Sequence, residues 1–253
     1  MTSSCTASTL ATVEKVAHNV AYSAGCRAVI LIVRPVRLEE IRPEMVSASE
    51  IVPGAVHLAG YLSDDDQRWM ARRCLELGAG ADGFYTPIVR GGHPMSVRML
   101  CLGRHWNART YSYEDVRADV DGRPAPSLPE DFAQIAHRAA AAAGFTFTPD
   151  TCIVNWYGAA SRMGLHQDKD ESPESIAQGL PVVSFSIGDS ARFLFGGLRR
   201  RDPVEKLLLE SGDAFVFGGA ARLRYHGITR ILPGTAPAGL PFEGRLNLTF
   251  RRF

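Results

Sequence analysis

The stretch Thr151-Cys-Ile-Val-Asn-Trp-Tyr-Gly-Ala-Ala-Ser-Arg-Met-Gly-Leu-His-Gln-Asp168 joins a strand-like apolar run to a His-X-Asp triplet. On extended backbone, residues two apart point to the same side, so the imidazole of His166 and the carboxylate of Asp168 can hold one ion together. This pair lacks a soft thiolate and suits a first-row divalent metal. A second imidazole would complete a two-His-one-carboxylate facial triad, which leaves metal positions open for a co-substrate and oxygen. His226 is the candidate for that third ligand.

The composition is that of a globular protein with room for a sizeable core. The 253 residues are 45% hydrophobic and 22% charged, and the net charge of +1 leaves only local basic patches to recognise phosphates. The five cysteines are scattered without a Cys-X-X-Cys pair, which argues against a disulfide framework or a zinc ribbon and favours a reducing compartment. No apolar run is long enough to span a bilayer and no signal-peptide pattern is visible. We therefore expect a cytoplasmic monomer with no membrane partner.

The order of predicted elements is two helices followed by a series of strands. Ser63 and the three aspartates after it predict a helix start, and Gly78 predicts its end. Pro129 with two acidic residues after it predicts a second helix, which Gly144 ends. From Thr151 onward, short alternating segments are separated by Gly-rich turns. The predicted strands are 95–102, 151–157, 182–187, 192–195, 207–209, 214–217, 223–228 and 245–251.

This order predicts a mainly β fold with flanking helices, of the α+β class, in which the strands form a jelly roll. A parallel α/β sheet would need interleaved helices, which the second half lacks. We expect residues 47–253 to form one structural domain, with a helix and loop-rich segment at 47–128 and the core at 129–253. Residues 1–46 form an N-terminal extension that carries no visible chemistry and could be poorly ordered.

The last predicted strand, Arg245-Leu-Asn-Leu-Thr-Phe-Arg251, alternates polar and apolar residues, so its polar side chains share one face. If that face points into a roll, two buried guanidinium groups need partners, because an unpaired buried charge is very costly. A small dicarboxylate would meet this need through paired hydrogen bonds. Residues 151–157 add an amide and a phenol on one face. With the metal triad, this set describes a pocket for a metal-chelating keto acid: Asn155, Tyr157, Arg245, Asn247 and Arg251.

A second motif, Arg104-His-Trp-Asn-Ala-Arg-Thr-Tyr-Ser-Tyr113, interleaves basic and aromatic residues. Such a loop can stack a nucleobase and hold a phosphate at once, or it can bury its aromatics as a satellite core. The cluster Arg199-Arg-Arg201 could likewise contact phosphate or form a solvated face.

Together these motifs resemble the AlkB family of Fe(II)- and 2-oxoglutarate-dependent dioxygenases, in particular its bacterial AlkB members. The similarity covers residues 95–253 and extends more weakly back to residue 50, without the N-terminal extension. The resemblance implies that the roll is a double-stranded β-helix. The segments that carry it are Asn155–Tyr157, Leu165–Glu171, Phe195–Leu198, Leu207–Asp213, Arg222–Ile228 and Arg245–Arg251.

The resemblance also implies the cofactors and the reaction. Fe(II) would be held by His166, Asp168 and His226, and the co-substrates would be O2 and 2-oxoglutarate, the latter bound by the five keto-acid residues named above. The partner would be DNA, or RNA, that contains N1-methyladenine or N3-methylcytosine, single-stranded or with the target base flipped from a duplex. Hydroxylation of the N-methyl group would release formaldehyde and leave succinate from 2-oxoglutarate.

For the base itself, the resemblance points to the aromatic loop as a nucleotide-recognition lid. Trp106 and His166 would lie on either side of the flipped base, with Tyr111 as a hydrogen-bonding lid residue. The loop is shorter than the family pattern, which leaves Tyr113 as an alternative to Tyr111. Asp170 would meet the exocyclic amino group of a cationic methylated base. Arg200 would contact phosphate, with its two neighbouring arginines as alternatives.

Three other interpretations compete. The same chemistry could act on methylated RNA or on protein side chains, and the Trp106 loop favours nucleic acid. A non-catalytic β-roll binding module would not need all three metal ligands together with Arg245 and Arg251. A zinc hydrolase of similar fold would leave those two arginines with no acid to bind.

Overall fold

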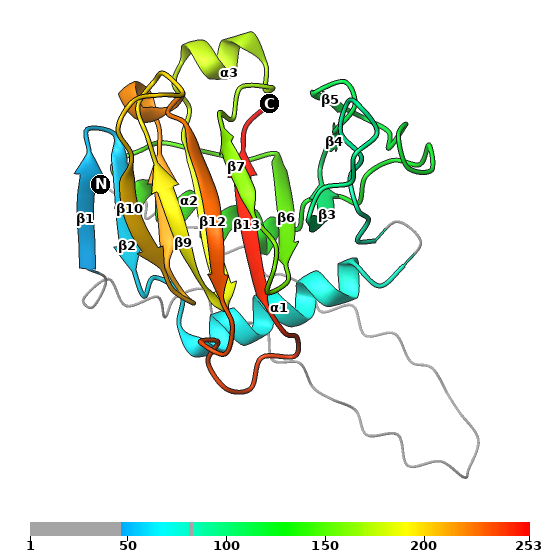
Figure 1. The fold of residues 1–253 in the computed structure, drawn as a ribbon, viewed down its shortest axis with the longest axis horizontal. Helices are drawn as coiled ribbons and strands as arrows, with labels where there is room; N and C mark the ends of the chain where they lie inside the picture. The colour runs from blue at the N-terminus through cyan, green and yellow to red at the C-terminus, as the bar shows by residue number, and fades with distance from the viewer. Residues whose placement is uncertain (1–46, 81–82) are drawn as a thin grey trace, which may run out of the picture. The chain divides into compact units, whose positions relative to one another are not determined.

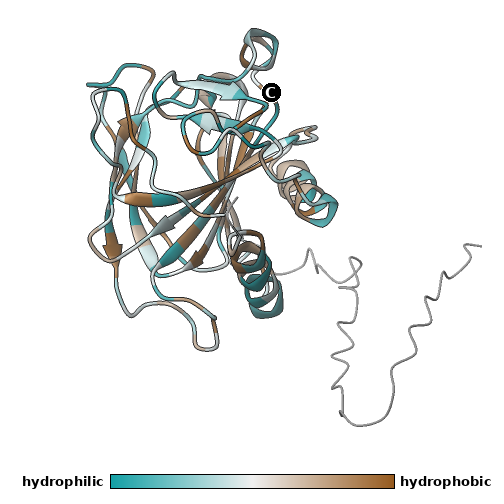
Figure 2. Cartoon of the chain, turned by 90° about the vertical axis from the view of Figure 1, so that its right-hand side faces the viewer, coloured by the Kyte–Doolittle hydropathy of each residue, from teal (hydrophilic) through white to brown (hydrophobic). Residues whose placement is uncertain are grey.

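Two antiparallel sheets face each other, and two helices cover the outer side of the larger one (Figure 1). The computed structural model describes residues 47–80 and 83–253, which belong to one compact unit. The expectation for residues 1–46 lies outside the described residues. Viewed from the side, both helices turn their apolar surfaces toward the sheets (Figure 2). This arrangement confirms the predicted mainly β fold with flanking helices.

The large sheet has seven strands in the order β1-β2-β11-β8-β13-β6-β3. Neighbouring strands run antiparallel throughout. Strand β13 lies inside the sheet, between β8 and β6. The bounds are β1 Ser47–Val52, β2 Ala55–Ala59, β3 Val97–Leu102, β6 Thr151–Tyr157, β8 Val182–Gly188, β11 Ala214–Phe217 and β13 Arg245–Arg251.

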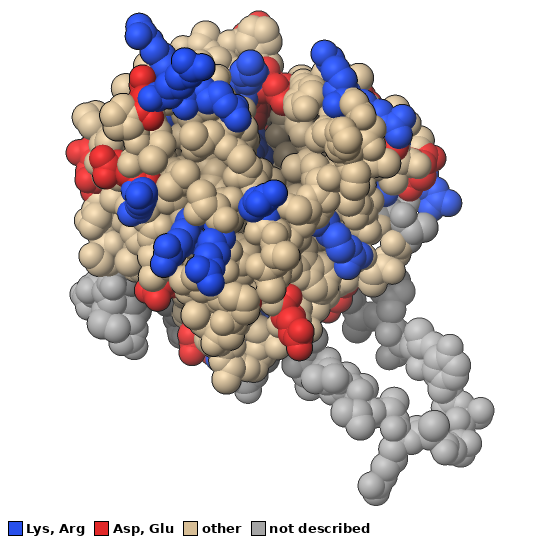
Figure 3. Space-filling model, in the orientation of Figure 1, with Lys and Arg blue, Asp and Glu red and all other residues tan. Residues whose placement is uncertain are grey.

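The small sheet has four strands in the order β10-β9-β12-β7, and a separate hairpin pairs β4 with β5. The surface is hollowed between the small sheet and this hairpin (Figure 3). The strand bounds are β4 His105–Asn107, β5 Ser112–Glu114, β7 Met163–His166, β9 Ser190–Phe195, β10 Glu205–Leu209 and β12 His226–Leu232. The helices are α1 Asp64–Leu77, α2 Glu130–Ala142, α3 Pro173–Ala177 and the 3-10 turn η2 Gly219–Ala221.

Helix α1 begins and ends where the sequence predicts. The Ser63 hydroxyl accepts a hydrogen bond from the Asp66 backbone, and the Asp66 carboxylate accepts one from the Ser63 backbone, which satisfies two free N–H groups at the helix start. Gly78 caps the other end. In the second helix, Pro129 is the capping residue and the first helical residue is Glu130, one position later than expected. No helix in the described part of the chain has the length and apolar character needed to cross a membrane.

Three strand predictions coincide with the structure, at 151–157, 214–217 and 245–251. The prediction at 223–228 was wrong in its bounds, because β12 begins at His226 and continues to Leu232. The 3-10 turn and the buried Arg222, which donates to the Leu180 carbonyl oxygen at 2.8 Å, hold the preceding residues outside the sheet. Strands β1 and β2 were not predicted. They extend the large sheet through β11, and β1 is an exposed edge strand without an apolar face.

Strand β13 is buried on both faces, so its polar face points into the roll, which is one of the two possibilities that its alternation left open. Leu246, Leu248 and Phe250 pack in the core shared with α1 and α2. The polar residues of the strand point between the two sheets, where they line the cavity described below. A second core of aromatic residues, mainly from β9 and β11, fills the other end of that space. One strand therefore supports the hydrophobic core with one face and the polar site with the other.

Replacement of Phe250 by alanine should destabilise the fold strongly. Phe250 is fully buried and its ring lies 5.6 Å from that of Phe185 and 6.5 Å from that of Phe132. Removal of a buried aromatic side chain costs about 3–5 kcal/mol. Urea titration should show this loss for Phe250→Ala, and a change within about 0.5 kcal/mol for Leu208→Ala, whose side chain is 46% exposed. Equal effects of the two substitutions would contradict the assigned core.

Candidate active site

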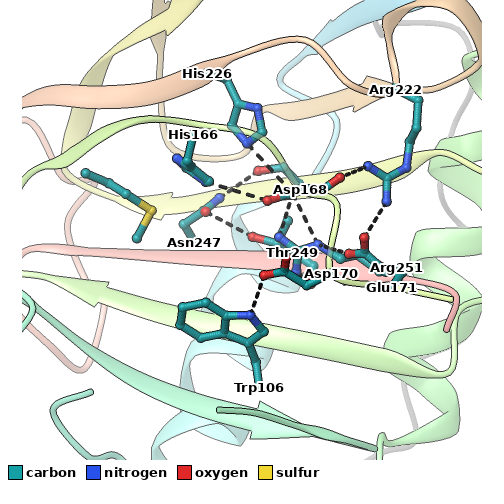
Figure 4. Close-up of polar contacts among 12 residues, drawn as sticks. Trp106, His166, Asp168, Asp170, Glu171, Arg222, His226, Asn247, Thr249 and Arg251 are labelled. Carbon is teal, nitrogen blue, oxygen red and sulfur yellow. Dashed lines mark hydrogen bonds and ion pairs between the residues drawn. The ribbon is translucent and has the colours of Figure 1, made fainter. Parts of the chain in front are cut away.

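Pairing of β7 with β12 brings the three predicted metal ligands together. His166 ends β7 and His226 begins β12, and the two are direct partners in the ladder, with ring centroids 4.4 Å apart. Asp168 follows β7 by two residues. Its carboxylate oxygens lie 3.6 Å from Nε2 of His166 and 3.7 Å from Nε2 of His226 (Figure 4). The three ligand atoms lie within 4.8 Å of one another, which is the two-His-one-carboxylate set of a facial triad.

Both imidazoles are oriented by backbone carbonyls. Nδ1 of His166 lies 2.9 Å from the Gly164 carbonyl oxygen, and Nδ1 of His226 lies 3.1 Å from that of Arg224. A carbonyl oxygen can only accept, so each Nδ1 carries the proton and each Nε2 lone pair faces Asp168. Burial, with the neighbouring His166, lowers the pKa of His226 to about 4. The imidazole is therefore neutral near pH 7, as a metal ligand must be.

Asp168 is held ionised by a buried network. Its Oδ2 accepts from Nη2 of Arg251 at 2.6 Å, while Nε of Arg251 lies 3.0 Å from Oε1 of Glu171. Nη2 of Arg222 donates to Oε2 of the same glutamate at 2.9 Å, and the Arg222 side chain also donates to the Asp168 backbone carbonyl. Burial alone would raise the pKa of Asp168, but Arg251 and the two imidazoles hold it well below its usual range. These residues fit a divalent cation.

Arg245, at the other end of β13, is buried and has no carboxylate partner among residues 47–80 and 83–253. Its Nη2 donates to the Ser186 hydroxyl at 2.7 Å and its Nη1 approaches two backbone carbonyl oxygens, but its Nε has no partner. Burial lowers the pKa of this guanidinium to about 10. The side-chain oxygen of Asn155 is likewise buried without a partner. A small acid would satisfy Arg245, so the pocket fits the carboxylate of 2-oxoglutarate.

The two strand-end arginines thus differ. The sequence predicts that both buried guanidinium groups need a partner, and Arg251 finds its partners, Asp168 and Glu171, inside the chain. An external acid for Arg245 stays a prediction. A contact from Arg251 to the keto acid stays a prediction. All five residues expected to bind the keto acid nevertheless line one cavity of about 400 Å³ between the sheets: Asn155, Tyr157, Arg245, Asn247 and Arg251.

The β4–β5 hairpin and the turn that joins its strands, which we call the lid, form one wall of the cavity mouth. Nε1 of Trp106 donates to Oδ2 of Asp170 at 2.9 Å, so the indole is held by the residue expected to contact the base. Tyr111 is 46% exposed and lies edge-on to Trp106, with centroids 5.8 Å apart. Tyr113 is buried against Phe253 in a small core, as the satellite-core alternative predicts for this loop. Tyr111 is therefore the tyrosine at the open end.

Arg200 also lines the cavity, and its Nη1 donates to the Leu165 carbonyl oxygen at 2.6 Å. Sequence reasoning assigned no role to Glu171 or Arg222, although both lie in the motifs quoted above. Their signal is weak, because the two residues are 51 positions apart and only the folded chain shows that they form an ion pair. Their burial identifies them as positioning residues for Asp168 and Arg251.

In the metal-free protein, acid should weaken folding through His226. Its folded-state pKa of about 4 lies below the value of 6.5 for a free imidazole, so the unfolded chain takes up the proton first as the pH falls. The free energy of unfolding should drop between pH 6.5 and 4, by on the order of 3 kcal/mol from this group. Urea titrations of metal-free wild type and His226→Gln measure this difference. A pH dependence that is the same in both proteins would contradict it.

Comparisons with known proteins agree with this geometry. A model described as the 2OG-Fe(II) oxygenase superfamily matches residues 54–251. The Arabidopsis thaliana protein named DNA N(6)-methyladenine demethylase ALKBH1C is 45% identical over 228 residues, which cover 82% of this chain and 50% of that protein. Alpha-ketoglutarate-dependent dioxygenase AlkB of Salmonella typhimurium is 44% identical over 207 residues, which cover 80% of this chain and 91% of the relative.

A solved structure titled "The structure of OsALKBH1" is 43% identical and superposes with a TM-score of 0.77, covering 82% of this chain and 100% of that one. This match confirms the double-stranded β-helix expected from the resemblance. The chain spans about half the length of the Arabidopsis relatives it matches. It belongs to the 2OG-Fe(II) oxygenase superfamily and, within it, to the AlkB family of Fe(II)- and 2-oxoglutarate-dependent dioxygenases.

Proposed function

We propose that this chain is an oxidative demethylase that repairs N1-methyladenine and N3-methylcytosine in DNA, with RNA as a further substrate. The observation that carries the proposal is Arg245, a buried cation with no carboxylate partner in the described residues, in the same cavity as the facial triad. Fe(II), 2-oxoglutarate and O2 supply the oxidising power that hydroxylates the methyl group. The product then loses formaldehyde, and 2-oxoglutarate becomes succinate and carbon dioxide.

The chain's own residues bind and orient the two substrates. His166, Asp168 and His226 would hold the metal. Arg245, with the amides of Asn155 and Asn247, would fix the keto acid in the depth of the cavity. Tyr157 has its hydroxyl 3.7 Å from the Met163 sulfur and closes the same region. Because these side-chain donors come from β6 and β13 in one sheet, the rigid backbone of that sheet would hold them in place around the co-substrate.

At the mouth, Trp106 and His166 offer the two faces between which a flipped base can stack. The hydrogen bond from Trp106 occupies Oδ2 of Asp170, and its Oδ1 has no partner among the described residues. That oxygen is free to accept from the exocyclic amino group of the base. N1-methyladenine and N3-methylcytosine carry a positive ring, which a carboxylate favours electrostatically.

The name of the Arabidopsis relative, DNA N(6)-methyladenine demethylase ALKBH1C, supports a second candidate substrate, N6-methyladenine in DNA. This base is neutral, and its methyl group sits on the amino nitrogen that Asp170 would otherwise contact. The two candidates therefore differ in how much they depend on the charge of Asp170. Substitution of Asp170 can therefore distinguish the two candidate substrates by experiment.

The first test measures formaldehyde and succinate from an N1-methyladenine oligonucleotide with Fe(II), ascorbate and 2-oxoglutarate. Wild type should form both products, and His166→Ala should form neither, because it lacks one metal ligand. Arg245→Gln should keep the metal but raise the KM for 2-oxoglutarate at least about 30-fold, as loss of a buried charge pair costs about 2 kcal/mol or more. Succinate without formaldehyde from wild type would support the assigned metal site and reject this nucleobase as the substrate.

The second test compares Asp170→Asn with Asp170→Ala. Asparagine keeps an oxygen that can accept from Trp106 but removes the negative charge, whereas alanine removes both. In Asp170→Asn, the preference for N1-methyladenine over N6-methyladenine, as a ratio of kcat/KM, should fall about tenfold, the equivalent of about 1.4 kcal/mol. The alanine variant should also lose activity on both bases, because its indole is no longer held.

An unchanged preference in the asparagine variant would show that the carboxylate does not recognise the cationic base. Wild-type activity on N6-methyladenine alone would favour the second candidate. In either case, the metal and keto-acid sites are tested separately by His166→Ala and Arg245→Gln.

A further inference from the structure

The outer face of the small sheet carries exposed basic residues, two of which lie directly opposite each other on neighbouring strands. In the strand register, Arg192 of β9 lies directly opposite Arg230 of β12 on one side and Leu208 of β10 on the other. Lys206 lies two residues before Leu208 on the same face of β10, opposite Leu194 of β9. These basic side chains are exposed, as is that of Arg162 just before β7. We call the set Arg162, Arg192, Lys206 and Arg230 the outer basic face.

No carboxylate within the described residues forms an ion pair with any of these four groups. By contrast, Arg68, Arg73 and Arg104 on other surfaces each pair with an acidic neighbour. Like charges directly opposite on neighbouring strands destabilise a sheet. The Arg192–Arg230 pair therefore works against folding, and a bound polyanion would relieve the repulsion.

The outer basic face lies near the mouth of the cavity that holds the metal ligands. Arg230 lies four residues after the metal ligand His226 on the same strand, which corresponds to about 13 Å along β12. In the space-filling view, Lys and Arg side chains lie over the small sheet on the same side of the molecule as the hollow beside the lid (Figure 3). A chain that leaves the cavity mouth can therefore continue across this face without turning around the molecule.

We propose that the outer basic face binds the sugar-phosphate backbone of the nucleic acid whose target base enters the cavity. This inference rests on the proposed function. At a rise of about 3.4 Å per nucleotide of one strand, 13 Å spans about four nucleotides. The face would thus contact phosphates about four nucleotides from the target base, and a much shorter substrate would not reach it. With a net charge of only +1, the chain has little long-range attraction for DNA, so such a local patch would set the affinity.

The test compares a 21-nucleotide strand that contains one N1-methyladenine with a trinucleotide centred on the same base. For Arg192→Gln, Arg230→Gln and the double variant, the Kd for the long strand is measured between 50 and 200 mM NaCl. Each single variant should weaken binding about threefold to tenfold. Each should also reduce the slope of log Kd against log salt by about 0.7, the value for one phosphate contact on a single strand.

The matched control is Arg72→Gln, which removes one exposed charge from α1 on the other side of the large sheet. It should leave affinity and salt slope unchanged. A purely structural role is tested by thermal unfolding: removal of one member of the like-charge pair should keep or raise the Tm of the variant while its affinity falls. Turnover of the trinucleotide should equal that of wild type in all variants.

Unchanged affinity and salt slope in the double variant would overturn the inference, as would an equal loss in Arg72→Gln. Binding of vesicles of phosphatidylserine that depends on these arginines, with no effect on nucleic acid, would also overturn it in favour of a membrane surface. If wild type demethylates neither the 21-nucleotide strand nor the trinucleotide, the proposed function fails. If it demethylates the 21-nucleotide strand and only the double-variant result is negative, the outer basic face alone is refuted.

Discussion

The buried ion pair between Arg251 and Asp168 is the contact on which the site depends, because it joins the two sheets at the metal position. Asp168 follows β7 of the small sheet, and Arg251 ends β13 of the large one. Glu171 and Arg222 extend this network toward the start of β12. A buried pair of this kind adds little net stability, but removal of one partner is strongly destabilising. The fold and the metal ligands are therefore positioned by the same charges.

The two ends of β13 show how stability and ligand binding are separated along one strand. Arg251 finds its carboxylates within the chain, whereas Arg245, six residues away on the same face, reaches only a hydroxyl and backbone carbonyls in the described part of the chain. The folded protein tolerates this buried charge because neutral oxygen atoms partly replace its hydration. The remaining deficit is what a carboxylate ligand would supply. Selectivity for an acid would thus come from an interaction that the protein leaves incomplete.

The sequence predicted the features that short-range patterns encode. Alternation located β6 and β13, and the His-X-Asp triplet with a distant histidine gave the ligand set that the β7–β12 pairing confirms. It could not predict contacts that depend on packing between distant segments. The Glu171–Arg222 pair and the internal neutralisation of Arg251 belong to this class. Strands β1 and β2 were missed for another reason: β2 is held by its pairing with β11 and β1 by its pairing with β2, and the exposed β1 shows no apolar face.

In the proposed function, the distribution of charge would also limit how a base is selected. Attraction of a nearly neutral chain for nucleic acid is weak beyond a Debye length of about 8 Å at physiological salt, so the energy needed to unstack a base must come from local contacts. In the mouth of the cavity these would be the Trp106 ring and the Asp170 carboxylate, which are linked by a hydrogen bond. Stacking and charge recognition would then not vary independently. A base that pulls Asp170 away from Trp106 would lose ring alignment as it gains a polar contact, which favours bases that engage only the free oxygen.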